Sequence, residues 1–551
     1  MPDHAAFVDN DVSQANRVTA AWLTDINDAA YGPYPAGTLG AALADTAGAS
    51  NGTTLLGWLR AATGTVATTL KRLLGWRDFN VMEFMSDAMR ADVEAGTALV
   101  DVSSAINAAI TAAGSGGCIE LPPYPMLCTS PILAEGKRGL TIRGKKGQFG
   151  WNGSRLICSH TGKAGLSLVG SLFCRLDGFI IEGATASRPK CGLLLGRSSA
   201  ASASNHTIID VNVQGYYAEV GTAIIASEEN TWINCYLVPT AARVAGVLIS
   251  PADGQTLNGA TVTFGGLTAS SMECNTFIGG AIGNVDSTAG TTGLYIDCGA
   301  STGHHHFYGT FMTKHGGDSF VTIRLGAIDG NGTEFPIGFH NVVGEHGATQ
   351  PTNGIHFLAA GSHIIAGLEI ENVRFQTPAT NHILCDGGGT VYMIGAKIRS
   401  PYRAAGRLPS TFHRMDACDA ELFSESAVTI SHAVGSRIRT LTAVVPTITT
   451  NTNNYVLDMA GTVRSRFGEL TGSATYDPGS LADGAGVTTT VTVTGAVAND
   501  YVIVSFARDL QGITMTGWVS AADTVSVRFQ NETGGVLDLA SGTILARVIK
   551  Q

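Results

Sequence analysis

Residues 101–132 carry two hydrophobic patterns in succession. Ile106 and Ile110 lie four residues apart, with alanines at the remaining positions of one helical face, and this amphipathic helix is expected to end at Gly114. From Cys118 onward apolar residues recur with the spacing typical of β-strands, on both sides of a Pro122-Pro123 break. This order predicts a short helix that covers the first strands of a growing stack.

Short strand-like runs recur between about residues 138 and 400, separated by turn residues, and none of the intervening text predicts a long helix. The chain therefore does not belong to the alternating βα class. Six similar segments begin at residues 231, 273, 305, 339, 368 and 391, at spacings of 42, 32, 34, 29 and 23. Such spacings predict one strand position repeated on successive coils of twenty-odd residues with inserted loops, that is, a parallel solenoid with like side chains stacked about 4.8 Å apart.

The C-terminal residues have a different hydrophobic pattern. Apolar and polar residues alternate strictly in Thr488–Val493, Tyr501–Phe506 and Val525–Phe529, with turns between these runs. This pattern predicts a compact antiparallel β-sandwich over residues 468–551 and, before it, a connector over 436–467.

The N-terminal text predicts helices rather than a domain core. An amphipathic helix is expected within residues 16–32, and a second one follows Thr65. Phe79, Val81 and Phe84 then alternate as a first strand.

Composition and charge exclude several classes of function. Only 14% of the residues are charged, 69 are glycine, and the formal net charge is -10, which argues against nucleic acid as a partner. No run of 18 apolar residues predicts membrane insertion, and the N-terminus has neither the basic nor the apolar region of a signal peptide. The ten cysteines occur singly in apolar contexts, which predicts a reduced, buried set assembled in the cytosol.

The cap at 101–132 resembles the entry to the pectate-lyase-like right-handed parallel β-helix of phage tailspikes and tail fibres, where a similar helix precedes Gly-Gly, a strand and Pro-Pro. The text from Thr53 to Met85 is similar to the neck that precedes this β-helix, and the end of the chain resembles a small C-terminal domain of tail fibres. The resemblance implies a mainly β homotrimer with these parts: a short helical virion-attachment region at 1–52, a neck with helix and first strand at 53–100, the capping helix and parallel β-helix at 101–435, the connector at 436–467, and the sandwich at 468–551, which assists trimer formation or contacts the host.

The same resemblance implies a phage tail receptor-binding protein, located in the virion tail after assembly in the host cytoplasm. Its partners would be phage tail or adaptor proteins at the N-terminal region and bacterial surface polysaccharide, either capsule or lipopolysaccharide O-antigen, along the β-helix. Such proteins bind and often depolymerise the polysaccharide with paired carboxylates, which implies an endoglycosidase without cofactors.

Acidic residues recur at about one coil in the middle of the chain, at steps of 24, 21, 27 and 24 from Glu273 to Glu369. Carboxylates on adjacent coils would lie roughly 5 to 10 Å apart, which spans both retaining and inverting glycosidases. A solvated outer face rich in acids would give the same spacing. Glu369 and Glu371 share one strand face at i, i+2, so we expect the pKa of one of them to be raised by its neighbour, as a general acid requires. The catalytic candidates are Glu345, Glu369, Glu371, Asp318 and Asp297.

Aromatic and basic residues near these acids supply candidates for binding sugar. Most such aromatic residues are equally well explained as core. His306, Tyr308 and Arg324 are also the groups that would accept a proton in a polysaccharide lyase. The histidines 304–306 are consecutive and therefore point to opposite faces, so we expect no metal site. The substrate-binding candidates are Trp232, Tyr295, Tyr308, His306 and Arg324.

Three alternatives stay open at this point: a non-catalytic host-recognition tail fibre, a polysaccharide lyase, and a cellular pectate-lyase-like enzyme that acts alone. The last one predicts a signal peptide and disulfides and no docking segment, which disagrees with the N-terminal text and the isolated cysteines.

Overall fold

A computed structural model describes residues 78–549 except for short stretches, and the chain divides into the units Met1–Phe79 and Asn80–Gln551. The expected helices before residue 78 lie outside the described residues. The undescribed stretches within the range are 147–152, 199–202, 255, 258–259, 269–270, 299–300, 326–335, 360–362, 377, 387–389, 401–409, 423–427, 441–445, 453, 459–462 and 466–468.

The helix predicted at the start of the solenoid is confirmed as α6 (Ser103–Ala113), which ends at Gly114 with a φ of 63°. Its apolar face, including Ile106 and Ile110, is buried and packs against β2 (Cys118–Glu120) and β4 (Ile132–Leu133).

The prediction of a longer first strand is wrong. The strand β1 covers only Asp78–Asn80, and a 3-10 helix, η2 (Val81–Phe84), and a helix, α5 (Asp87–Ala95), follow it. The Asn80 side chain accepts a hydrogen bond from the Met82 amide at 2.9 Å, which starts the 3-10 turn where a strand was expected.

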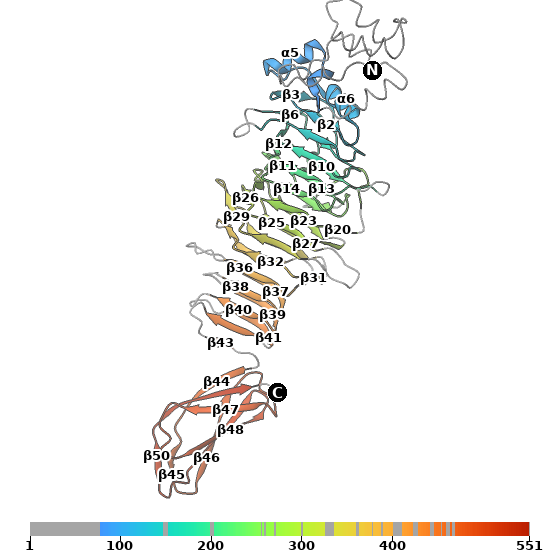
Figure 1. Cartoon of the computed structure of the whole chain (residues 1–551). Coiled ribbons are helices and arrows are strands. Elements are labelled where there is room, and N and C mark those ends of the chain that lie inside the picture. Colours follow the sequence, from blue (N-terminus) through green and yellow to red (C-terminus); the bar gives the residue numbers. More distant parts are fainter. Residues whose placement is uncertain are drawn as a thin grey trace, which may run out of the picture. The chain divides into compact units, whose positions relative to one another are not determined.

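Three stacks of parallel strands form the solenoid, so its prediction as a parallel β-helix is confirmed (Figure 1). Along the first sheet the order of strands follows the chain. The pairs from β2 to β42 are parallel, and the last pair, β42 with β43, is antiparallel. The strands of the first sheet after β2 are β5 (Thr141–Arg143), β8 (Arg175–Asp177), β11 (Thr207–Ile209), β14 (Thr231–Ile233), β21 (Thr276–Ile278), β25 (His305–Tyr308), β28 (Ile337–His340), β32 (Glu369–Glu371), β36 (Lys397–Ser400), β38 (Asp419–Leu422), β40 (Arg437–Thr440), β42 (Tyr455–Asp458) and β43 (Val463–Ser465).

The second sheet is shorter and ends at β33. Its strands are β3 (Pro125–Cys128), β6 (Arg155–Cys158), β9 (Ile180–Gly183), β12 (Asn212–Tyr217), β15 (Tyr236–Leu237), β22 (Ala281–Asn284), β26 (Phe311–Lys314), β29 (Val343–His346) and β33 (Arg374–Phe375), with β16 (Ala241–Ala242) paired to the end of β12.

The third sheet begins at β4 and carries the longest strands. The others are β7 (Ala164–Ser167), β10 (Cys191–Gly196), β13 (Val220–Ile225), β17 (Ala245–Ser250), β23 (Thr292–Cys298), β27 (Ser319–Leu325), β30 (Asn353–Ala359), β31 (His363–Ala366), β34 (Asn381–Asp386), β35 (Val391–Ile394), β37 (Ser410–Asp416), β39 (Val428–Val434) and β41 (Thr447–Thr452).

The length of one coil varies along the solenoid. Residues at matching turn positions are 24 apart at Asn205 and Glu229, 31 apart at Asn341 and Asn372, and 18 apart at Cys418 and Ser436. Parallel pairing continues through β42, so the last coils fall within the stretch predicted as connector. The domain boundaries themselves stay a prediction.

A ladder of polar side chains lines the turn that enters the first sheet; we call these residues the turn ladder. The Asn230 amide group donates to Asn275 at 2.8 Å, and the Asn275 backbone amide donates to His305 Nδ1 at 3.3 Å. His206 occupies the same position one coil before Asn230, and its backbone amide donates to Asn230 Oδ1 at 3.0 Å. These bonds satisfy backbone groups that the turn would otherwise bury unpaired.

Aromatic rings stack inside the solenoid beneath the first sheet. Trp232, Phe277, Phe307 and Phe339 occupy one register position on four successive strands, and their ring centroids are 5.4, 4.8 and 5.0 Å apart. Because side chains alternate along a strand, the neighbours of these rings in the same strands point to the outer face.

The third sheet is covered on its outer side as well. A loop with the hairpin β18 (Thr256–Leu257) and β19 (Ala260–Thr261) brings Leu257, Phe264 and Leu267 into one apolar cluster with Leu194 and Leu248. A small parallel pair, β20 (Ser271–Glu273) with β24 (Ser301–Gly303), lies between the strands of the main sheets in the sequence.

The antiparallel sandwich predicted at the C-terminus is confirmed. One three-stranded sheet, which we call the tyrosine sheet, has the order β44-β51-β47, and the other, the tryptophan sheet, has the order β46-β49-β48. Their apolar inner faces form one core. The strands are β44 (Glu469–Tyr476), β45 (Gly479–Leu481), β46 (Gly486–Thr492), β47 (Tyr501–Phe506), β48 (Thr514–Ala521), β49 (Thr524–Gln530), β50 (Leu537–Leu539) and β51 (Gly542–Ile549).

All ten cysteines are free thiols, and eight of them are buried. Burial raises the pKa of several, for example that of Cys385 to about 12, which keeps them as thiols. Within the described part of the chain, no helix is long and apolar enough to cross a membrane.

Candidate functional site

The ten residues predicted for the site lie in four different places. The interior holds Trp232, and the second sheet holds Glu345. Four lie on or beside the third sheet, namely Tyr295, Asp297, Asp318 and Arg324, and four lie on the outer face of the first sheet, namely His306, Tyr308, Glu369 and Glu371.

The acids do not form one ladder. In the middle of the solenoid one coil takes 27 to 34 residues, as the register pairs Asp297–Arg324 and Ser319–Asn353 show. Each acid step is shorter than the coil at the place where the step begins, so each step moves the next carboxylate to a different position around the coil. The expectation of stacked carboxylates from Glu273 to Glu369 is therefore wrong.

Two of the predicted sugar-binding rings are core residues. Trp232 and Tyr295 are each 1% exposed, the first in the interior aromatic stack and the second under the loop that covers the third sheet. Burial raises the pKa of Tyr295 far above its usual value. Neither ring can stack on a sugar, so the alternative of core residues holds for both.

Asp297, which is fully buried, forms a bidentate ion pair with the half-buried Arg324. Arg324 Nε and Nη2 donate to the two carboxylate oxygens of Asp297 at 3.0 Å each, and the Ser250 hydroxyl donates to Asp297 at 3.2 Å. Burial works against the charge of Arg324, but the bonds to Asp297 outweigh it and raise the pKa of Arg324. Neither side chain suits proton transfer to a substrate, which removes Arg324 as the base of a lyase.

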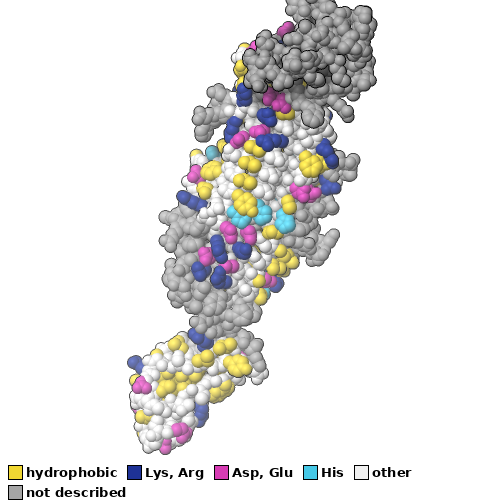
Figure 2. All heavy atoms as spheres, in the orientation of Figure 1, with side chains coloured by type: hydrophobic (Ala, Val, Ile, Leu, Met, Phe, Trp, Pro, Cys, Tyr) yellow, Lys and Arg dark blue, Asp and Glu magenta, His cyan; other side chains and the backbone are white. Residues whose placement is uncertain are grey.

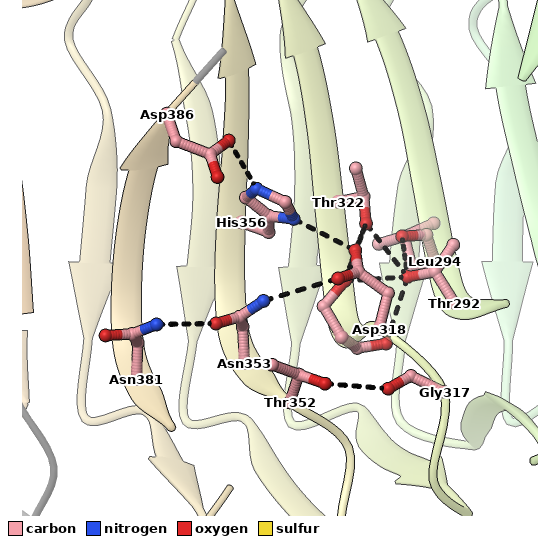
Figure 3. Close-up of polar contacts among 11 residues, drawn as sticks. Thr292, Leu294, Gly317, Asp318, Thr322, Thr352, Asn353, His356, Asn381 and Asp386 are labelled. Carbon is pink, nitrogen blue, oxygen red and sulfur yellow. Dashed lines mark hydrogen bonds and ion pairs between the residues drawn. The ribbon is translucent and has the colours of Figure 1, made fainter. Parts of the chain in front are cut away.

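Asp318 belongs to a polar cluster on the outer side of the third sheet (Figure 3). His356 is held between Asp318, at 2.9 Å from Nδ1, and Asp386, at 2.7 Å from Nε2. Asn353 donates to Asp318 at 3.3 Å and accepts from Asn381 at 2.9 Å. Burial works against the charge of His356, and the bonds to the two carboxylates outweigh it and raise the pKa of His356.

Glu345 is exposed on β29 of the second sheet, where it lies opposite Thr313 in β26. Its side chain faces solvent near the end of the strand. The other four predicted acids lie elsewhere, on the first or third sheet.

The outer face of the first sheet brings together four of the predicted residues and one that the sequence reasoning missed. We call His306, Tyr308, His340, Glu369 and Glu371 the histidine–glutamate face. The rings of Tyr308 and His340 stack with centroids 4.7 Å apart, and His306 lies 5.8 Å from each of them. Tyr308 is 41% exposed, so one ring of this platform is open to solvent.

Both glutamates contact the missed residue, His340. Glu371 lies 3.3 Å from its Nδ1 and Glu369 lies 3.6 Å from its Nε2. Lys397, on the next strand, donates to Glu369 at 3.2 Å. The two carboxylates therefore flank one imidazole, directly beside the aromatic platform.

Gly338 makes room for the histidine rings on this face. A Cβ atom at Gly338 would lie 2.4 Å from His306 Nδ1 and 2.5 Å from His340 Nε2. Burial, followed by repulsion from His340, lowers the pKa of His306, so His306 is a neutral ring at neutral pH.

Charged pairs continue along the same face on the following coils. Arg399 and Arg437 both contact Asp419, and Arg439 pairs with Glu421 at 2.8 Å. Figure 2 shows histidine side chains gathered near the middle of the solenoid and acidic and basic side chains beyond them. Among the described residues, no group of three or more His, Cys, Asp or Glu side chains could hold a metal ion.

The residues that sequence reasoning missed are His340, His356 and Asp386. Each stands singly among apolar residues, and its partners lie about one coil away in the chain, 31 residues for His340–Glu371 and 30 for His356–Asp386. The only signal was this spacing, which becomes visible once the length of the coil is known.

Comparisons with known proteins give a limited result. No family model and no curated protein matches the chain. Among the solved structures that it resembles are tailspike proteins of E. coli bacteriophage HK620. One, in complex with a pentasaccharide, has 11% identity, covers 89% of this chain and 95% of its own, and has a TM-score of 0.46. A variant in complex with a hexasaccharide has 11% identity, covers 89% and 96%, and has a TM-score of 0.41. At these values the likeness carries no argument about function, and the fold rests on the observed strand pairing.

Proposed function

We propose that this protein is a phage tail receptor-binding protein that binds bacterial surface polysaccharide on the histidine–glutamate face. The observation that carries the proposal is the platform of Tyr308, His306 and His340 beside the carboxylates of Glu369 and Glu371. Aromatic rings pack against the apolar face of sugar rings, and carboxylates bind their hydroxyls. The platform lies on an open sheet that continues over several coils, which suits a chain-like ligand better than a small molecule.

We further propose that the face cleaves its ligand by glycoside hydrolysis. Glu371, whose side chain is 42% exposed, acts as the general acid and gives its proton to the glycosidic oxygen as the bond to the anomeric carbon breaks. Glu369, held by Lys397 and His340, takes a proton from the water that attacks the anomeric carbon. The products are two shorter chains, one with a new reducing end.

The spacing of the two glutamates leaves the stereochemistry to experiment. Alternate residues of a strand lie about 6.6 Å apart at Cα, and their carboxyl groups can approach or diverge from that value. Attack by Glu369 itself would retain the configuration at the anomeric carbon, and attack by water would invert it. The NMR spectrum of the anomer that forms first distinguishes the two outcomes.

The virion assignment rests on the resemblance of the neck and cap to tailspikes. We propose that residues 1–52 attach the protein to tail or adaptor proteins, and that the mature protein is a homotrimer in the virion tail, assembled in the host cytoplasm. The tyrosine sheet supports self-association, because Tyr501, Ile503 and Leu545 on its outer face are 64%, 55% and 52% exposed.

The test uses capsule and lipopolysaccharide preparations from a panel of bacteria. The wild-type protein should bind at least one of them and release new reducing ends. Glu371→Gln and Glu369→Gln should each lower the cleavage rate by about 10²-fold or more, the loss expected for a general acid or base, while binding persists. Glu120→Gln, which changes a half-buried glutamate on β2 of the same sheet, is the matched control and should cut at the wild-type rate.

Other results would assign a different function. Binding without any cleavage by the wild type would support the non-catalytic tail fibre. An unsaturated uronate product would support a lyase, with His306 or Tyr308 as the base. A Glu345→Gln variant that alone loses activity would move the site to the second sheet.

A further inference from the structure

The tryptophan sheet presents an aromatic ring to solvent. Trp518 on β48 is 44% exposed, whereas its neighbours Gly517 and Val519 point into the sandwich. A Cβ atom at Gly517 would lie 2.7 Å from Val504 Cγ1 of the opposite sheet, which shows how closely the two sheets pack behind Trp518. The ring is therefore mounted on a rigid layer and is not part of the core.

Hydroxyl groups surround Trp518 on the same face. Trp518 is paired in register with Ser526, which is paired with Thr490 on the far strand. Ser526 donates a hydrogen bond to the hydroxyl of Ser520 at 2.7 Å. In the next row Arg528 lies between Thr516 and Thr488, and all three are exposed.

Arg528 is held in place by Gln530. Its Nε and Nη2 donate to Gln530 Oε1 at 3.1 and 2.7 Å. Gln530 is neutral, and it in turn donates a hydrogen bond to Glu532 at 2.7 Å. Because Arg528 is already held in one position, it loses less entropy when a ligand binds it. None of the outward positions of the three strands is acidic: they are Gly486, Thr488, Thr490, Thr492, Thr514, Thr516, Trp518, Ser520, Thr524, Ser526, Arg528 and Gln530.

The opposite face of the sandwich has a different chemistry. The tyrosine sheet exposes Tyr501, Ile503 and Leu545, and its Arg547 lies opposite Ile503 in register. Such a largely apolar face suits a second copy of the chain. A face of hydroxyls with one aromatic ring and one positive charge suits a sugar.

We propose that the outer face of the tryptophan sheet is a second glycan-binding site, additional to the histidine–glutamate face, for acidic polysaccharide. A pyranose ring stacks on Trp518, its hydroxyls bond to Thr490, Thr516 and Ser520, and a carboxylate substituent pairs with Arg528. The guanidinium fork of Arg528 fits a carboxylate in a bidentate manner.

The experiment measures retention of the full chain on an array of acidic and neutral bacterial capsular polysaccharides. A Tyr308→Ala background weakens the first site, so that the retention left reports the second. In this background Trp518→Ala should weaken binding to acidic polysaccharides by about tenfold or more, the loss of one aromatic anchor. Arg528→Gln should weaken binding to acidic polysaccharides alone. Val536→Ala, which changes an exposed apolar residue outside both three-stranded sheets, is the control and should change nothing.

Each outcome decides the proposal. It is overturned if Tyr308→Ala alone removes all retention, or if the Trp518→Ala and Val536→Ala variants bind the same polysaccharides equally well. A selective loss with Trp518→Ala supports it, provided that the melting temperature matches the wild type. Whether the first site binds polysaccharide is measured separately, by comparing the retention of Tyr308→Ala with that of the wild type.

Discussion

His206 and His305 are uncharged residues of the turn ladder, and their burial makes the fold sensitive to acid. Burial lowers the pKa of His206 to about 4 and that of His305 to about 3. In the unfolded chain both would titrate near 6.5, so the unfolded state binds more protons below that pH. Folding stability from these groups is therefore complete above pH 6.5 and is lost as the pH falls toward their folded pKa values.

We expect the free energy of unfolding to fall by about 2 kcal/mol for each of these histidines between pH 7 and pH 5. His305→Asn should reduce the loss, because asparagine occupies the same position at Asn230 and Asn275 and does not titrate. Melting temperatures at pH 5 and pH 7 test this. An equal decrease in the variant and the wild type would contradict it.

His356 supplies a control of opposite sign. Its pKa is raised in the folded state by Asp318 and Asp386, against the effect of its own burial. Its contribution to stability is complete below pH 6.5 and is lost as the pH rises through its folded pKa. His356→Asn should therefore lower the melting temperature more at pH 6 than at pH 9.

At the scale of the elements, β28 determines whether the aromatic platform forms. Gly338 leaves the space in which the rings of His306 and His340 lie, so Gly338→Ala should push them apart and disturb the ring of Tyr308 as well. Binding of polysaccharide should weaken by about tenfold, the scale of one well-placed contact. Affinity measurements on immobilised polysaccharide test this.

Gly535→Ala is the matched control, because a Cβ atom there meets nothing within 4 Å. Wild-type affinity in Gly338→Ala would show that the rings adapt without loss and that their spacing does not matter.

The positions of the strands could be predicted from the sequence, but the sheet on whose face each side chain lies could not. Alternating runs bounded by glycine and asparagine mark strands such as β25, β28 and β32, and the helix pattern marks α6. The face that a residue occupies depends on the number of residues in each coil, which the loops change from one coil to the next. Asp297 and Asp318 were therefore grouped with Glu369, although they lie on or beside the third sheet.

The burial of individual side chains was the second property that could not be predicted from the sequence. The text around Trp232 reads as a strand that could expose its ring, yet the inner face of β14 places it in the aromatic stack. The residue pair Glu369 and Glu371 was predicted correctly to share one face, because that inference needs only the two-residue period of a strand.

At the scale of the whole molecule, the tyrosine sheet should contribute to a trimer. A side chain of this kind contributes about 1.5–3 kcal/mol when it becomes fully buried, so three copies of Ile503 and Leu545 would stabilise the assembly appreciably. Ile503→Asp places a charge in that interface, and the trimer should dissociate at a lower temperature than the wild type. Thr490→Asp introduces the same charge on the opposite sheet and should leave the assembly unchanged. Sedimentation measures the mass against 57.0 kDa for one chain. A wild-type monomer, or equal behaviour of the two variants, would contradict this assignment of the tyrosine sheet.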